Sequence, residues 1–281
     1  MSLHLSSLKR WPMRLRRYVR ARSLRYMAGL IAVVLSVVVL CLPSAYSVQW
    51  PGPTLNVLGD SGGQPVVKVS GANTYQDTGK LLLTTVSANG VPGYPVSNAE
   101  VIWALLDSAR VVKPREAVVP VGQTTKEYQA ETLKDMTSSQ DKAVKAATSV
   151  LEEQGVDVSK LEVSMHVDDI GGPSAGMMYA LGLIDELTPQ NESGGKTIAG
   201  TGTINDKGEV GAIGGIKLKM LGAKRDGATW FLAPKGNCDD VVGHVPSGLR
   251  DVQVSNLNEA YDALVAIGEG RGDELPHCTV D

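Results

Sequence analysis

The sequence predicts an α+β domain that follows a single N-terminal transmembrane helix. An uncharged apolar run fills residues 27–42, and the first acidic residue is Asp60. Further along, segments with the apolar period of a helix alternate with segments of period two, which is typical of strands. This alternation indicates an α+β or α/β domain.

The composition is that of a folded globular protein. The chain has 281 residues, of which 43% are apolar and 20% charged, so one or two domains with a substantial core are expected. Its net charge of -3 argues against nucleic acid as a general partner. Eight Lys and Arg residues precede Asp60, however, and the rest of the chain is acidic.

Residues 27–48 reach the roughly 20 residues that a bilayer-spanning helix needs. Basic residues flank this span on its N-terminal side alone, which places that side in the cytoplasm and the following domain outside it. A cleaved signal peptide is the alternative, because Ala45-Tyr46-Ser47 carries small residues at suitable offsets. We favour a membrane anchor because the basic segment is unusually long. The predicted division is a cytoplasmic tail (1–26), the anchor (27–48), a strand-rich region (49–130), the main domain (131–268) and a polar tail (269–281).

The elements before the main domain begin with strands at residues 66–69 and 80–86. The capping box Ser97-Asn98-Ala99-Glu100 starts a helix over 97–109. Pro114 and Pro120 make 111–120 a loop.

In the main domain, Thr137-Ser138-Ser139-Gln140 is expected to cap a helix that ends at Gly155. The later elements are predicted from apolar period and turn residues. They are a strand at 161–167, a helix that starts near Ser174, a hairpin of 197–204 with 209–213, a helix after Gly215, strands at 229–232 and 252–254, and helices at 238–245 and 257–267.

Ser174 and Lys217 are the candidate catalytic residues. Ser174 lies in Gly172-Pro173-Ser174-Ala175-Gly176 at the start of an apolar helix, where the free backbone N–H groups of Ser174 and Ala175 would hold an oxyanion. A lysine can deprotonate a serine only if burial lowers its pKa. Lys217 shares the spacing i, i+3, i+4 with Met220 and Leu221, so we expect it to be buried; Lys219 is then turned away from that stripe.

These residues resemble the serine and lysine boxes of the Lon family of serine peptidases, P-S-A-G and G-G-[LI]-K. The segment from about residue 136 to 267 is similar to the Lon proteolytic domain, which implies an α+β fold and a Ser174–Lys217 dyad, with Thr201 supporting the lysine. Many members place an acid three residues before the serine; here that position is Gly171, with Asp168 and Asp169 upstream.

The resemblance also carries expectations about partners. With its anchor, the chain looks like a membrane-bound Lon-like branch that often carries a PDZ insertion, for which the sequence before residue 161 leaves no room. We found no Walker motif, so ATP-independent cleavage of flexible protein or peptide segments is expected. Lon-like domains often form rings, which implies a homo-oligomer.

Two other interpretations are open. Gly172 to Gly176 also matches the G-x-S-x-G elbow of α/β-hydrolases, with His244 or His277 as the triad histidine, but the preceding strand alternates polar and apolar residues, unlike a buried central strand. The other is a catalytically inactive membrane scaffold or peptide-binding protein that retains the Lon fold.

The cysteines predict no cofactor or metal site. Cys41 falls within the apolar span, which leaves Cys238 and Cys278 to form a disulfide that would fix the tail to the domain, or to remain two separate thiols. No CxxC motif or His/Cys cluster suggests a metal.

Overall fold

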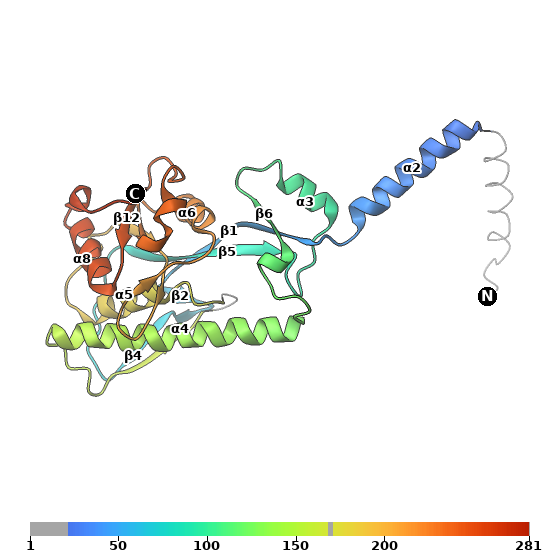
Figure 1. Cartoon of the computed structure of the whole chain (residues 1–281). Helices are drawn as coiled ribbons and strands as arrows, with labels where there is room; N and C mark the ends of the chain where they lie inside the picture. Colours follow the sequence, from blue (N-terminus) through green and yellow to red (C-terminus); the bar gives the residue numbers. More distant parts are fainter. Residues whose placement is uncertain (1–21, 168–170, 281) are drawn as a thin grey trace, which may run out of the picture.

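The protein is built on a six-stranded sheet with helices on both faces (Figure 1). The computed structural model describes residues 22–167 and 171–280. The strand order is β12-β11-β8-β5-β1-β6. These strands are β1 (Tyr46–Asn56), β5 (Lys80–Asn89), β6 (Val111–Pro114), β8 (Thr197–Gly200), β11 (Trp230–Pro234) and β12 (Arg250–Val254).

The sheet is parallel at one end and antiparallel at the other. Strands β5, β8, β11 and β12 run parallel, whereas β1 pairs antiparallel with both β5 and β6. The parallel strands lie between two layers of helices and consist largely of buried apolar residues, as a strand covered on both faces requires. Three small pairs complete the strands: β2 (Asp60–Ser61) with β3 (Gln64–Pro65), β4 (Val67–Ser70) with β7 (Glu162–Met165), and β9 (Thr203–Ile204) with β10 (Val210–Gly211).

Helix α5 (Gly176–Leu187) is the centre of the larger core. Eleven of its residues are buried, and it packs against α4 (Thr125–Glu153) and α8 (Leu257–Gly268). Only the C-terminal half of α4 carries a buried stripe, which starts at Ser139 and continues through Ala143 to Leu151. The first turns of α4 therefore extend beyond the core.

The opposite face of the sheet is covered by α6 (Ile216–Arg225) and the short α7 (Cys238–Val241), which share a second core with residues such as Phe231. A disulfide joins Cys238 to Cys278, with their Cα atoms 4.9 Å apart. Of the two alternatives that the sequence left open, the structure therefore contains the bridge, which holds the C-terminal segment against this face.

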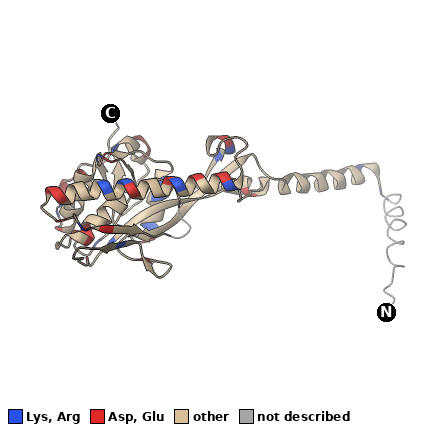
Figure 2. Cartoon of the chain, turned by 90° about the horizontal axis from the view of Figure 1, so that it is seen from below, with Lys and Arg blue, Asp and Glu red and all other residues tan. Residues whose placement is uncertain are grey.

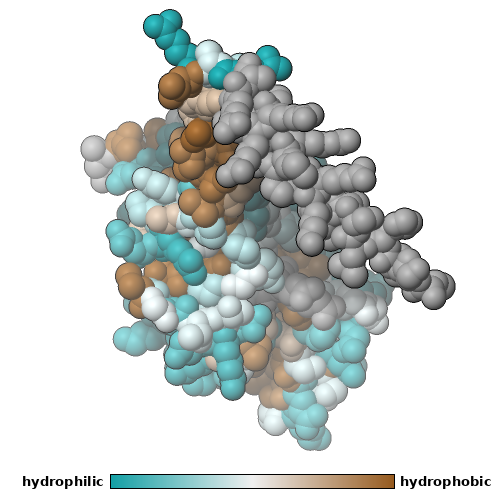
Figure 3. Space-filling view, turned by 90° about the vertical axis from the view of Figure 1, so that its right-hand side faces the viewer, coloured by the Kyte–Doolittle hydropathy of each residue, from teal (hydrophilic) through white to brown (hydrophobic). Residues whose placement is uncertain are grey.

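Helix α2 (Leu24–Cys41) projects from the domain, and after Arg25 it carries no charged residue. It is long and apolar enough to cross a membrane, and none of its residues is buried. Figure 2 shows it without acidic residues, and Figure 3 shows its apolar side chains beside a more polar domain surface. The helix ends seven residues before the predicted limit of the span, because residues 46–48 already belong to β1.

Several predicted boundaries differ from the structure. Part of the predicted loop 111–120 is strand β6, which pairs with β1 through Val112 and Lys113. Helix α4 begins at Thr125 rather than near 137, because Thr124 and Glu127 form the capping box. The predicted domain limit at residues 130 and 131 consequently falls inside α4.

The remaining expectations agree more closely with the structure. The capping box of Ser97 and Glu100 starts α3 (Asn98–Ala104), which is shorter than predicted. The predicted strand 197–204 is divided: β8 joins the main sheet, and β9 forms the hairpin with β10. The mixed α/β architecture confirms the predicted fold class.

Candidate active site

Ser174 lies in the loop that enters α5, and its backbone is fixed by two other segments. Its carbonyl oxygen accepts hydrogen bonds from Gly202 N (2.9 Å) and Thr201 Oγ1 (2.9 Å). From the other side, Ser139 Oγ of α4 donates to Pro173 O at 3.0 Å. The serine loop is thus held between α4 and the connection from β8 to β9.

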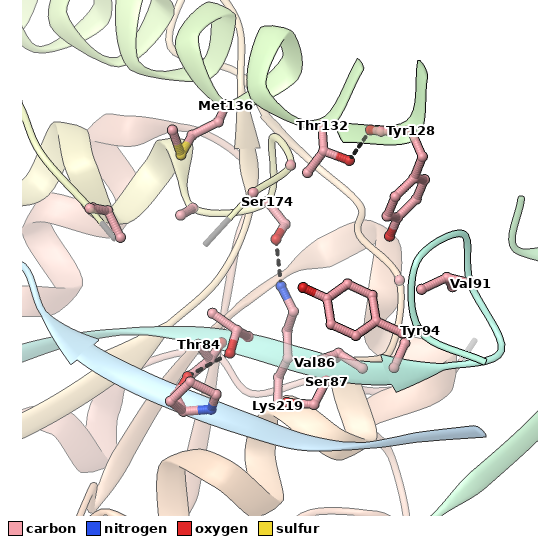
Figure 4. Close-up of a pocket in the computed structure, with 18 of the residues that line it drawn as sticks. Thr84, Val86, Ser87, Val91, Tyr94, Tyr128, Thr132, Met136, Ser174 and Lys219 are labelled. Carbon is pink, nitrogen blue, oxygen red and sulfur yellow. Dashed lines mark hydrogen bonds between the residues drawn. The ribbon is translucent and has the colours of Figure 1, made fainter. Parts of the chain in front are cut away.

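The base that reaches Ser174 is Lys219. Lys219 Nζ donates to Ser174 Oγ at 2.7 Å (Figure 4). It also donates to Thr201 Oγ1 at 2.8 Å. The residue is 3% exposed, and none of the described carboxylates forms an ion pair with it. Because burial disfavours the ammonium form, the pKa of Lys219 falls from 10.5 to about 7.

The expectation that Lys217 lies at Ser174 is therefore wrong. The Lys217 side chain is 41% exposed, and its amine lies 3.9 Å from Asp240 on the outer surface. The buried stripe of α6 starts one residue earlier than predicted: Ile216, Lys219, Met220 and Ala223 follow the spacing i, i+3, i+4, i+7. The apolar spacing that identifies Lys219 is present in the sequence. The match of Lys217 to the G-G-[LI]-K pattern led us to start the buried stripe at residue 217 instead of residue 216.

Thr201 is fully buried and sets the hydrogen-bond direction at the dyad. Its hydroxyl has one proton, which it donates to Ser174 O, so its oxygen can only accept from Lys219. The lone pair of a neutral Lys219 amine is then free to point at Ser174 Oγ. Thr201 thus lies where the sequence comparison with Lon boxes predicted a supporting threonine, although the lysine that it contacts is different.

Backbone N–H groups are available beside the serine. Ala175 is buried directly before the first residue of α5, and neither the Ser174 nor the Ala175 N–H has an acceptor among the residues that the structure describes. Both residues line the same pocket as Lys219. Two donors at a helix start can hold a developing oxyanion.

A groove of about 910 Å³ leads to the dyad. One wall is the second half of β5, from Thr84 to Asn89, and the other is the first half of α4, including Tyr128, Thr132 and Met136 (Figure 4). β5 pairs with β8 only as far as Leu83. Beyond Leu83, in the described part of the chain, strand pairing uses only the β1 edge, which leaves the edge facing the groove unpaired.

Gly171 contacts the opposite wall of the groove. A Cβ atom at Gly171 would lie 2.0 Å from Thr132 Cγ2, and Gly172 N donates to Thr132 O at 3.3 Å. The acid that many Lon domains carry at the position of Gly171 would therefore require the Thr132 side chain to move. Asp168 and Asp169 lie outside the described residues.

The geometry does not support a serine–histidine triad. His244 and His277 are absent from the residues that line the groove, and His244 Nδ1 lies 3.1 Å from Val242 O on the surface. In the part of the chain that the structure describes, the hydrogen-bond partner of the Ser174 hydroxyl is an amine.

Comparison with known proteins agrees with this arrangement. Residues 116–267, more than half of the chain, match the model of the Lon protease (S16) C-terminal proteolytic domain. Lon protease 1 of Bacillus subtilis is 36% identical over 141 residues, which cover 46% of this chain and 18% of that protein. Lon protease 2 of Herpetosiphon aurantiacus is 30% identical over 201 residues, covering 70% of this chain and 22% of that protein.

These relatives are much longer than the matched region, so the chain spans about a fifth of their length. The match extends beyond the dyad, since it begins before α4 and ends in α8. Lon proteases of this kind are serine peptidases, and their proteolytic domain has the mixed α/β fold described above. The chain belongs to the Lon protease (S16) C-terminal proteolytic domain family.

Proposed function

We propose that this protein is a membrane-anchored serine endopeptidase that acts outside the cytoplasm with Ser174 as nucleophile and Lys219 as general base. The observation that carries the proposal is the 2.7 Å hydrogen bond between Lys219 Nζ and Ser174 Oγ. At a pKa of about 7, a large fraction of Lys219 is neutral near pH 7 and can accept the serine proton.

The reaction begins when neutral Lys219 takes the proton from Ser174 and the oxygen attacks a peptide carbonyl. The N–H groups of Ser174 and Ala175 stabilise the oxyanion, and the protonated lysine then gives its proton to the leaving amine. Water, deprotonated by the same lysine, hydrolyses the acyl-enzyme. Thr201 keeps the lysine amine directed at the serine in each step.

The groove supports an extended peptide as substrate. The edge of β5 beyond Leu83 offers unpaired backbone groups, to which a flexible segment can add as a further strand. A folded domain cannot present its backbone in this way, so unfolded segments, loops and peptides are the expected substrates. We expect cleavage without ATP, and self-association of the kind found in Lon-like rings is part of the proposal.

The anchor and the disulfide support the location. α2 has the length and composition of a membrane span, and the basic N-terminal segment predicts a cytoplasmic N-terminus. Disulfides persist in oxidising compartments, so the Cys238–Cys278 bridge favours a domain outside the cytoplasm.

The dyad is tested by hydrolysis of casein with the full chain in detergent. Ser174→Ala and Lys219→Met should each lower kcat/KM by at least about 10³-fold, because both remove a group that acts in the transition state. Lys217→Met is the matched control, since it removes a lysine two residues away, and should change kcat/KM by less than about threefold. Full activity in Lys219→Met would reject Lys219 as the base.

A protein that cleaves nothing would instead be a scaffold that retains the fold. An active-site serine reagent separates these cases, because it should label Ser174 in the parent chain and fail to label it in Lys219→Met. Two experiments test the location. The protein should stay in the membrane fraction after alkaline extraction, and a protease added outside intact cells should digest its domain. Protection of the domain from that protease would contradict it.

A further inference from the structure

A second cluster of titratable side chains lies at the far end of α5, away from the dyad. Asp77, Asp185 and Glu192 each offer a carboxylate oxygen, and these oxygens lie within 4.8 Å of one another. The residues come from the segment before β5, from the last turns of α5 and from the loop that leads into β8. Among the described residues, no ion pair links that segment or that loop to α5.

Two of the three residues are buried, Asp77 is half-buried, and the described residues provide no compensating positive charge. Asp185 and Glu192 are each 2% exposed. In the described part of the chain, no Lys, Arg or His forms an ion pair with the three carboxylates. Lys196, a few residues further along, donates instead to the carbonyl oxygens of Ile267 and Gly268. Burying several carboxylates together is very unfavourable unless a proton or a cation compensates them.

Asp185 is the unsatisfied member. Neither of its carboxylate oxygens receives a hydrogen bond, and the second oxygen of Glu192 is also without a partner. By contrast, Asp77 accepts from Gly79 N (2.7 Å) and Ser193 N (2.7 Å), and Glu192 Oε1 accepts from Tyr261 OH (3.1 Å). Asp77 and Glu192 are thus fixed in position by donors, whereas no N–H or hydroxyl donor of the described residues reaches the Asp185 oxygens.

We propose that Asp77, Asp185 and Glu192 form a binding site for a divalent cation, with Ca²⁺ as the favoured ion. Ca²⁺ binds carboxylate oxygens at about 2.3–2.6 Å, so two of its ligands are at most about 5 Å apart, as here. Thr188 Oγ1 and Ser193 Oγ hydrogen-bond to Glu192 and Asp77, so they place neutral oxygens beside two of the three carboxylates. Such an irregular set of oxygens suits Ca²⁺ better than Mg²⁺, which requires a regular octahedron.

A bound cation would connect three parts of the catalytic framework. α5 begins beside Ser174, the loop 188–196 leads into β8 and then to Thr201, and Asp77 precedes β5, which lines the groove. The ion would therefore stabilise the fold around the dyad without contacting the substrate. This inference does not depend on the proposed peptidase activity, because its test measures binding and stability.

Thermal unfolding of the full chain in detergent tests the site. After removal of metals with EDTA, Ca²⁺ at about 100 times its Kd should raise Tm by roughly 5–10 °C. Asp185→Asn should abolish the shift, because it removes a ligand charge while keeping the shape of the side chain. Asp262→Asn, an exposed acid on α8, is the matched control and should keep the shift in full.

Terbium luminescence provides a second measurement. Tyr261 lies beside Glu192 and can sensitise a bound Tb³⁺ ion, so the luminescence should appear in the parent chain and fall at least tenfold in Asp185→Asn. Added Ca²⁺ should displace Tb³⁺ at lower concentration than Mg²⁺. Stronger competition by Mg²⁺ would overturn the choice of Ca²⁺.

Two outcomes would overturn the site itself. In the first, the Tm of the parent chain is the same in EDTA, Ca²⁺ and Mg²⁺, and neither Ca²⁺ nor Mg²⁺ displaces Tb³⁺. This result would mean that a shared proton compensates the carboxylates. Equal loss of the shift in Asp185→Asn and Asp262→Asn would indicate binding to the general acidic surface. If Asp185→Asn does not fold, displacement of Tb³⁺ from the parent chain decides the question.

Discussion

The pKa of Lys219 makes a quantitative prediction about the pH dependence of cleavage. With a pKa of about 7, the neutral fraction of Lys219 is about 1% at pH 5, half at pH 7 and about 90% at pH 8. If the neutral amine is the base, kcat/KM for casein should rise roughly 90-fold from pH 5 to pH 8 and remain level above pH 8. Lys217→Met should show the same profile.

The same burial predicts that Lys219 lowers stability. Its pKa falls from 10.5 to about 7 on folding, so the folded protein binds the proton less strongly than the unfolded chain does. The full cost, on the order of 5 kcal/mol, is present below pH 7 and disappears as the pH rises from about 7 to the value of the free side chain. We expect Lys219→Met to be inactive yet more stable at pH 7, with a gain that shrinks by about 1.4 kcal/mol per pH unit up to about pH 10.

The stability difference is measured by urea unfolding of the full chain in detergent at pH 7 and pH 9, with tryptophan fluorescence as the signal. The pH profile is measured from initial rates of casein cleavage. An activity that continued to rise tenfold per unit through pH 8 to 10 would show that the base has the pKa of an ordinary lysine. A loss of stability in Lys219→Met that is equal at both pH values would refute the reasoning about burial.

Three further predictions concern residues around the site. In steady-state kinetics, Thr201→Val should lower kcat by about 10–100-fold with little change in KM, while Thr201→Ser retains most of the activity, because only the hydroxyl orients Lys219. Equal losses in both variants would mean that the methyl group matters more. Gly171→Ala should displace the serine loop and reduce casein cleavage, because its Cβ would lie 2.0 Å from Thr132 Cγ2, and the added substitution Thr132→Ala should restore activity; failure of this rescue would place the effect elsewhere. In urea unfolding without reductant, Cys278→Ser should lower the free energy of unfolding by about 4 kcal/mol, which is the loop-closure value for a bridge between residues 40 apart. An unchanged urea midpoint would indicate that the C-terminal segment is held by its other contacts.

Local patterns were sufficient to predict much of the fold. Period-two alternation, capping boxes and glycine stops predicted β5, α3, α8 and the strands around the dyad near their observed positions. β1 was missed, since Pro51 and Pro53 interrupt its sequence and its first residues continue an uncharged segment. Its strand conformation comes from pairing with β5 and β6, which no local pattern reveals.

The site was predicted in part for similar reasons. Ser174 and Thr201 lie in distinctive local motifs, but the choice between Lys217 and Lys219 depends on which face of α6 meets the sheet. In the structure the buried face of α6 includes Ile216, Lys219 and Met220, and the helix follows Gly215, whose φ is 73°. The cluster of Asp77, Asp185 and Glu192 could not be predicted at all, because its members are brought together only by the folded chain.

If the proposed peptidase is anchored by α2, the position of the groove restricts which substrates it can reach. Tyr94 and Val91 line the groove, and the same connection continues to Val96 and Asn98, which hydrogen-bond to Ser44 and Leu42 at the base of α2. If α2 lies in a bilayer, this end of the groove lies near the lipid surface, within a few residues of the span. Suitable chains would then be tethered ones, such as the stalks of other membrane proteins or segments emerging from a translocation channel, whereas freely diffusing proteins would have to approach the lipid first.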